Sequence, residues 1–189
     1  MPTLQLTDVE QAREYFDRTR DRVVEAVWGL SDAQAKFKPA PDRWCIAENL
    51  EHMVMVQERI LGPVLEQLAT APSAPVGRDN LQIDTIVLEK IPDRSIKAQA
   101  PEFINPTGQC SVSAALDRLF QNYERLLDYV QSTPDLREHV LESPPLKFVT
   151  NGAYPTADGY QWALCIAAHD ERHVRQIHEV KADPNYPVA

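Results

Sequence analysis

Three of the chain's five histidines lie close together near its C-terminal end, in the stretch AAHDERHVRQIHEV. In an α-helix, at about 100° per residue, His169 and His173 lie about 40° apart on one face. Both imidazoles can therefore reach one ion. His178 lies about 180° from His169, which predicts that it faces solvent or another element. The spacing makes His169 and His173 a candidate pair of metal ligands and leaves His178 outside that pair.

The helix face around His169 is mostly apolar and is expected to point into the protein. Its members are Trp162, Cys165, Ile166, Arg172, Gln176, Ile177 and Val180. Buried ring nitrogens need partners, because an unpaired buried polar group costs roughly 1–3 kcal/mol. A metal ion would satisfy one nitrogen of each ring. For an isolated HxxxH pattern, however, histidines paired with protein groups or solvent are the commoner explanation.

A third ligand from elsewhere in the chain would favour a metal site over histidines that are simply paired with protein groups or solvent. His52 is the best candidate for this ligand. On a helix, His52 lies at the edge of an apolar surface, although a satisfied core or boundary histidine is the alternative there. Glu48 is one turn earlier and about 40° away, so it could orient the imidazole or move a proton. Surface charge in a first helical turn is the other explanation for Glu48. Asp170, about 100° off the ligand face, and His139, in a polar connection, are weaker candidates.

Four segments have the apolar periodicity of helices. A short helical turn at Ser31–Gln34 is also expected from its capping-box spacing, and Gly62 with Pro63 predicts a kink or break. Two long connections, 72–110 and 134–157, are rich in proline, and LQIDTIVLEKI in the first alternates in places like a strand. The pattern predicts an all-α four-helix bundle with long crossover connections. The four segments are 7–30, 46–71, 113–131 and 156–183.

Length and composition indicate one globular domain, 1–189, with 43% hydrophobic and 25% charged residues. The net charge of −9 disfavours nucleic acid and anionic membranes as partners, because phosphate binding depends on Lys and Arg. The sequence contains no apolar run of membrane-spanning length and no recognisable secretory leader, so a cytoplasmic protein is expected. The three cysteines are far apart, with no CxxC. Any metal site must therefore rest on histidines and carboxylates.

Two fragments resemble one known family. DRWCIAENLEHMVMV and YQWALCIAAHDERHVRQIHEV are similar to the helix signatures of the DinB-like family, which includes metal-dependent hydrolases and thiol S-transferases. The resemblance implies a four-helix bundle with an up-down-down-up arrangement. It also implies that His52, His169 and His173 hold a divalent metal ion, with zinc or nickel favoured and iron or manganese as alternatives.

The resemblance further implies a thiol-dependent S-transferase acting on small electrophiles, with a low-molecular-weight thiol as co-substrate, or a metal-dependent hydrolase. A non-catalytic metal-binding or small-ligand-binding protein is the alternative. Arg172 and Gln176 flank the ligands and are candidates for binding a small-molecule substrate, with a helix-packing salt bridge as the other reading for Arg172. A homodimer is also expected. Cys45 departs from the Ser or Thr that the family usually has, and Cys165 is a candidate extra soft ligand.

Overall fold

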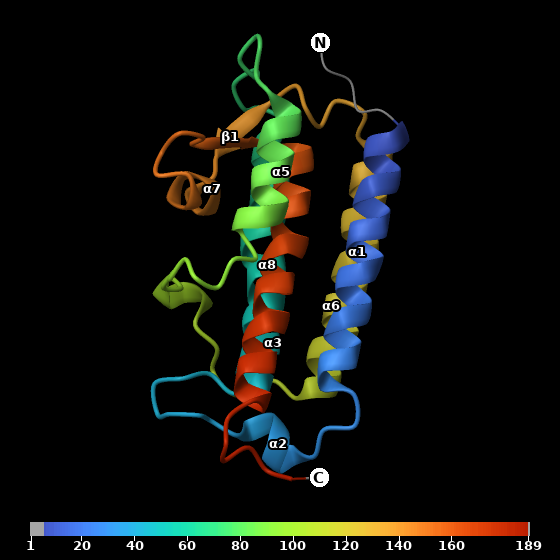
Figure 1. Ribbon diagram of the computed structural model, residues 1–189. Helices are drawn as coiled ribbons and strands as arrows, with labels where there is room; N and C mark the ends of the chain where they lie inside the picture. Colours follow the sequence, from blue (N-terminus) through green and yellow to red (C-terminus); the bar gives the residue numbers. More distant parts are fainter. Residues whose placement is uncertain (1–5, 189) are drawn as a thin grey trace.

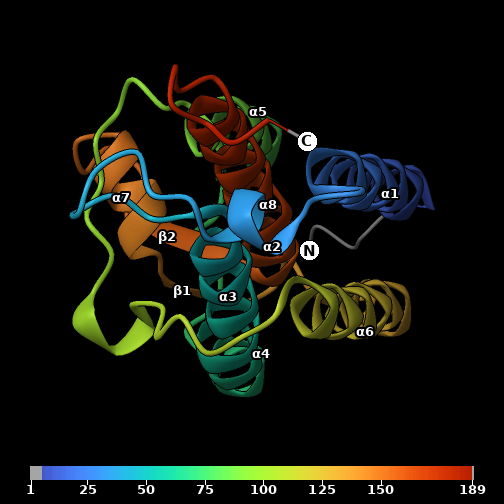
Figure 2. The ribbon, with the colours of Figure 1, turned by 90° about the horizontal axis from the view of Figure 1, so that it is seen from below.

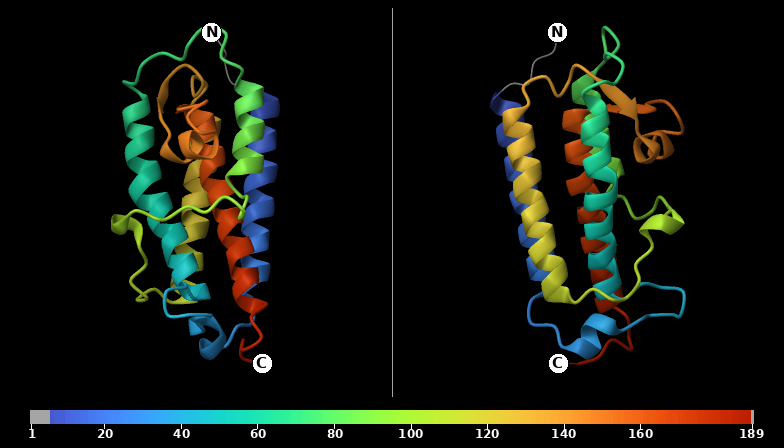
Figure 3. Two further views of the ribbon diagram at one scale, coloured as in Figure 1. Left: turned by 60° about the vertical axis from the view of Figure 1, so that its left-hand side comes forward. Right: turned by 180° about the vertical axis from the view of Figure 1, so that it is seen from behind.

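Most of the chain is helical. The computed structural model describes residues 6–188, and its four longest helical segments lie side by side (Figures 1 and 3). Helices α1 and α8 run in one direction, and α3 and α6 run in the other. Seen from below, α1 and α3 occupy opposite corners, and each packs against both α6 and α8 (Figure 2). The four helices are α1 (Leu6–Val27), α3 (Ile46–Val56), α6 (Val112–Ser132) and α8 (Gly159–Lys181).

The second long helical segment changes its geometry in the middle. After α3 comes a π-helical turn, η1 (Gln57–Leu61), and then α4 (Gly62–Leu68). Proline has no N–H to donate to the preceding turn and its ring crowds that turn, so Pro63 disturbs the regular ladder. The interruption expected at this point takes the form of the π-helical turn directly before it.

The first long connection contains a helix that the sequence pattern did not predict. LQIDTIVLEKI belongs to α5 (Asn80–Lys90), and the expected strand-like alternation was wrong. The Asp79 side chain caps this helix by accepting from the Gln82 backbone N at 3.0 Å. Ile83, Val87 and Ile91 recur every fourth residue and are buried, and α5 packs on α8. This spacing is helical, but the run is short enough for the alternation to obscure it.

The short elements lie in the connections. Helix α2 (Asp32–Lys36) has the expected capping box, in which Gln34 N donates to Ser31 Oγ at 3.3 Å. A 3₁₀ turn, η2 (Glu102–Ile104), lies between α5 and α6. In the second long connection, β1 (Val140–Glu142) pairs antiparallel with β2 (Thr156–Asp158), with α7 (Pro144–Val149) between them. This small sheet departs from the all-α prediction.

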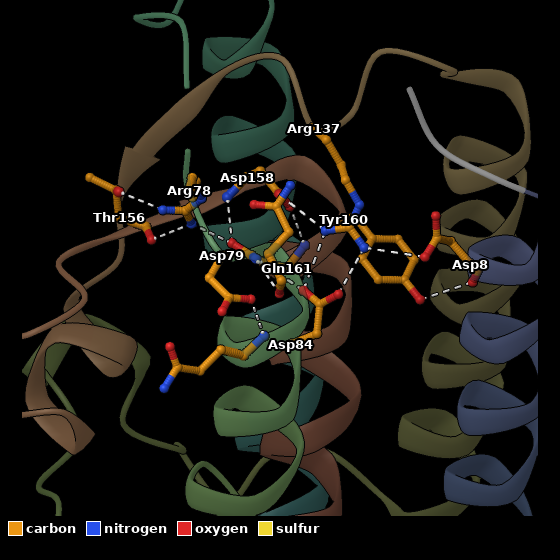
Figure 4. A network of polar contacts seen from close by, with 11 residues as sticks. Asp8, Arg78, Asp79, Asp84, Arg137, Thr156, Asp158, Tyr160 and Gln161 are labelled. Carbon is orange, nitrogen blue, oxygen red and sulfur yellow. Dashed lines mark hydrogen bonds and ion pairs between the residues drawn. The ribbon is translucent and has the colours of Figure 1, made fainter. Parts of the chain in front are cut away.

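A buried arginine joins several of these elements at one end of the molecule (Figure 4). Arg137 donates to Asp84 at 2.8 Å and to Asp158 at 3.2 Å, and it forms an ion pair with Asp8 at 3.4 Å. Its guanidinium also lies over the ring of Tyr160, 4.2 Å from the ring centroid. The cluster therefore connects α1, α5 and the start of α8 to the segment before β1.

Apolar side chains fill the space between the helices in two groups. One lies around Phe16, Leu126 and Trp162, and the other around Leu50, Leu119 and Ile177. Together they bury the apolar stripes of α1, α3, α6 and α8, which fixes how these helices face one another. No helix within residues 6–188 has the length and apolar character needed to cross a membrane.

Candidate metal centre

Three histidines converge between α3 and α8. The Nε2 atom of His169 lies 3.2 Å from Nε2 of His52 and 3.1 Å from Nε2 of His173. One ring nitrogen from each residue lies within 4.8 Å of the others. The one-turn spacing on α8 places His169 next to His173, and the packing of α3 against α8 brings in His52. The structure thus brings together the three residues that the sequence named as metal ligands.

Two of the imidazoles are held through their other nitrogen. Nδ1 of His52 donates to the Ile104 carbonyl at 2.7 Å, and Nδ1 of His173 donates to Asn49 Oδ1 at 2.9 Å. The amide of Asn49 is oriented by its own Nδ2, which donates to the Cys45 carbonyl at 2.8 Å. Because both acceptors are oxygens without a proton, each Nδ1 carries the hydrogen. Nε2 of His52 and His173 is then an unprotonated lone pair, as metal ligation requires.

The spacing of these nitrogens suits a divalent ion. With Zn–N bonds of about 2.0–2.1 Å at tetrahedral angles, ligand nitrogens lie about 3.3 Å apart. The observed separations of 3.1 and 3.2 Å are close to this value. Three neutral imidazoles suit zinc, nickel, iron and other divalent ions. Three protein ligands, rather than four, are typical of a site that leaves one position for water or substrate.

Burial keeps two of these rings neutral. It lowers the pKa of His52 to about 3, with the neighbouring His169 as a second cause. The same two causes, in the same order, hold the pKa of His173 well below its usual value. Protons therefore compete weakly for these two nitrogens near pH 7. The indole of Trp44 lies against the pair, with ring centroids 4.7 Å from His52 and 6.0 Å from His173.

A buried carboxylate lies beside the third histidine. Asp170 is fully buried, and its Oδ1 lies 3.5 Å from Nδ1 of His169. Its Oδ2 accepts from Gln57 Nε2 and from the Tyr123 hydroxyl, both at 2.6 Å. The helical wheel disfavoured Asp170 because it lies off the ligand face. Helix α8 is buried on nearly every side, however, so its other faces also meet protein.

Glu48, the carboxylate that the sequence favoured, makes its contacts elsewhere. Its Oε2 accepts from the Cys45 backbone N at 2.9 Å, and its Oε1 pairs with Lys38 Nζ at 2.7 Å. It therefore acts as a helix cap at the start of α3, and the acceptor for His52 is the Ile104 carbonyl. Sequence periodicity gave no sign of Ile104, because the residue lies in an irregular connection.

The two candidate substrate residues have different surroundings. The guanidinium of Arg172 donates to the carbonyls of Ile91, Asp93 and Ile96, with 2.6 Å to the last. It thereby holds the segment that leads from α5 towards η2. Gln176 is buried and forms no side-chain hydrogen bond within residues 6–188. Of the two, Gln176 has more hydrogen-bonding capacity left, because both terminal guanidinium nitrogens of Arg172 already donate to carbonyls.

The remaining candidates lie outside the histidine cluster. His178 is exposed, as expected, and His139 bonds to the Ala71 carbonyl at 2.7 Å. Cys165 is buried and is not a member of the cluster, and burial raises the pKa of its thiol to about 12. Cys45 is also buried, and burial likewise raises its thiol pKa. Neither thiol has the exposure or lowered pKa of a reactive cysteine.

Comparison with known proteins places these features in a family context. The family model described as the DinB superfamily matches residues 15–177, which include all three histidines. An uncharacterized protein from Bacillus subtilis (strain 168), YuaE, is 26% identical over 168 residues, covering 88% of this chain and 94% of that protein. No solved structure matches the chain significantly.

Proposed function

The chain belongs to the DinB superfamily, and on this basis we propose that it is a metal-dependent enzyme whose ion is held by His52, His169 and His173. A divalent ion held in this way supplies Lewis acidity, which lowers the pKa of water or of a thiol and provides a nucleophile near neutral pH. The observation that carries the proposal is the convergence of the three Nε2 atoms, with two Nδ1–H groups already donating to oxygens.

We propose transfer of a low-molecular-weight thiol to a small electrophile as the reaction, with metal-dependent hydrolysis as the second candidate. The rings of His52 and His173 are neutral, as ligands must be. Trp44 packs against both rings and shields one side of them from water. Gln176 is the stronger candidate for a substrate contact, because the guanidinium of Arg172 is already engaged. Glu48 would contribute indirectly, by capping the helix that carries His52.

The wider architecture is part of the proposal. The directions of α1, α3, α6 and α8 support a four-helix bundle of the up-down-down-up type, with α5 added against α8 (Figure 1). Zinc or nickel is the expected ion, with iron and manganese as alternatives. A homodimer and a cytoplasmic location remain predictions. Light scattering on the purified protein would test the first of them.

Metal content tests the centre directly. Protein purified without a nickel column should contain about one divalent ion per chain, and His52→Ala or His169→Ala should lose it, because two imidazoles bind far more weakly than three. His178→Ala is the matched control, since this histidine is exposed, and it should retain the metal. Unchanged metal content in both ligand variants would refute the proposed centre.

Activity assays separate the reaction classes. Glutathione, bacillithiol, mycothiol and coenzyme A would each be offered with a generic electrophile, and ester substrates would be tested in parallel. Metal-dependent consumption of one thiol, lost in His169→Ala, would support S-transfer, and ester cleavage without thiol would support hydrolysis. A protein that binds metal stoichiometrically but shows neither activity would favour the non-catalytic alternative.

A further inference from the structure

His169 is the only one of the three ligand residues whose second nitrogen has no hydrogen bond. Nδ1 of His169 is buried and unpaired, and so is the nearest carboxylate oxygen, Oδ1 of Asp170. The two atoms lie 3.5 Å apart. An unpaired buried donor or acceptor is costly, so two such atoms facing each other call for an explanation. A small rotation of either side chain would bring them within hydrogen-bonding distance.

The position of one proton links these two atoms to the metal centre. Nε2 of His169 faces the lone pairs of two other Nε2 atoms, which belong to His52 and His173. If the neutral His169 ring carries its proton on Nε2, it can donate to those neighbours, but Nε2 cannot bind an ion. If the proton is on Nδ1, Nε2 becomes a ligand and the N–H points towards Asp170.

We propose that Asp170 is a positioning residue. Its Oδ1 accepts a hydrogen bond from the Nδ1–H group of His169 and so favours the tautomer whose Nε2 binds the metal. The inference rests on the metal centre proposed above. The carboxylate is itself fixed, because Gln57 and Tyr123 both donate to Oδ2 at 2.6 Å and leave Oδ1 for the imidazole. Gln57 opens the π-helical turn, so this irregular segment supplies one of the two groups that orient Asp170.

Asp170→Asn tests this role, because the two existing hydrogen bonds at Oδ2 favour one orientation of the new amide. With its oxygen in the place of Oδ2, the amide keeps the hydrogen bonds from Gln57 Nε2 and the Tyr123 hydroxyl, and its NH₂ group then faces His169. The NH₂ donates to Nδ1 and thereby places the imidazole proton on Nε2, where it blocks ligation. The side chain keeps its size and shape, but the preferred tautomer is reversed.

Zinc affinity, measured by competition with a chromogenic chelator, is the readout. Asp170→Asn should bind zinc about tenfold to a hundredfold more weakly than the wild-type protein, and the absorption spectrum of its cobalt form should change. Glu171→Gln is the matched control. It neutralises the adjacent buried acid, which pairs with Arg22 and Arg175 on another face of α8, and it should retain wild-type affinity.

The outcomes distinguish this inference from the proposed function. Absence of stoichiometric metal in the wild-type protein would refute the proposed function. Wild-type zinc binding with unchanged affinity in Asp170→Asn would refute only the role of Asp170. Should that variant fail to fold, nitrogen-15 NMR of the zinc-loaded wild-type protein decides. A protonated Nδ1 on His169, with the downfield proton of a bond to a carboxylate, supports the role, and a solvent-exchanging or unprotonated Nδ1 overturns it.

Discussion

The second nitrogens of the three imidazoles face three different kinds of oxygen. His52 donates to the main-chain carbonyl of Ile104, and His173 donates to the side-chain amide of Asn49. His169 has the carboxylate of Asp170 nearby. A carbonyl or amide holds the ring in place, whereas a carboxylate also makes the imidazole a better donor to a metal ion. The three ligands are therefore expected to differ in their electronic contribution.

Asn49→Ala tests how far metal affinity depends on a neutral acceptor. The change removes the partner of His173 Nδ1, so the ring loses its fixed orientation and the Nε2 lone pair is no longer aimed at the ion. We expect zinc affinity to fall about tenfold to a hundredfold, as measured by chelator competition. Asn185→Ala, at an exposed position, is the control. Equal affinity in both variants would contradict this role of Asn49.

The three histidines of the candidate metal centre were easier to predict than the groups that hold them. Helical spacing made His169 and His173 candidates, its place at the edge of an apolar helix face made His52 a third, and the family resemblance joined the three into one site. Asn49 looks like an ordinary polar helix residue until the packing of α3 and α8 is known, and the same packing reverses the order in which the sequence ranked Glu48 and Asp170. Ile104 contributes a main-chain oxygen, which any residue type would supply, so the sequence carries no signal for it.

At the scale of elements, the connection between α5 and α6 is held against the bundle by charged side chains. Arg172 donates to three of its carbonyls, and Arg59 donates to the Phe103 carbonyl at 2.6 Å. Further along, both carboxylate oxygens of Glu51 accept hydrogen bonds, from the Thr107 hydroxyl and the Gly108 backbone N. Periodicity located the long helices, but contacts of this kind depend on tertiary position and could not be predicted from it. These contacts thus hold the connection, with its Ile104 carbonyl, in a fixed position beside the histidine cluster.

Arg172→Met should make the connection between α5 and α6 more mobile, but the protein should still bind its metal ion. Hydrogen bonds to a charged group contribute roughly 1.5–3 kcal/mol each, and losing them should raise local opening at least about tenfold. Limited trypsin digestion would report this as faster cleavage after Lys97, which is exposed in the same segment. Metal content should stay near one ion per chain. Arg125→Met, at an exposed position on α6, is the control, and equal cleavage rates would argue against the anchoring role.

At the scale of the whole molecule, α8 connects the proposed metal centre to the arginine cluster shown in Figure 4. Its N-terminal cap, Asp158, accepts from Arg137, while His169 and His173 lie further along the same helix. Arg137 also binds Asp84 of α5 and Asp8 of α1. The cluster therefore fixes how three helices meet at the end where α8 begins, and this arrangement sets the direction in which the ligands project.

Arg137→Met should destabilise the whole fold. It leaves Asp84 and Asp158 without their buried cation. Removing one partner of a buried ion pair costs roughly 3–5 kcal/mol of stability. Urea denaturation at pH 7, followed by circular dichroism, measures the loss. Arg125→Met serves again as the exposed control and should change the free energy of unfolding by no more than about 0.5 kcal/mol. A loss in Arg137→Met as small as that would contradict the structural role.

The loss in Arg137→Met should also shrink on acidification. Burial raises the pKa of Asp158 to about 6 in the wild-type protein, while Arg137 acts in the opposite direction. Without that cation the folded-state pKa of Asp158 rises further above its unfolded value near 3.8. The folded variant then binds the proton more tightly than the unfolded chain does, so lowering the pH from 7 to 5 stabilises the variant relative to the wild-type protein. A deficit that stays constant or grows over this range would show that Asp158 is not the group left uncompensated.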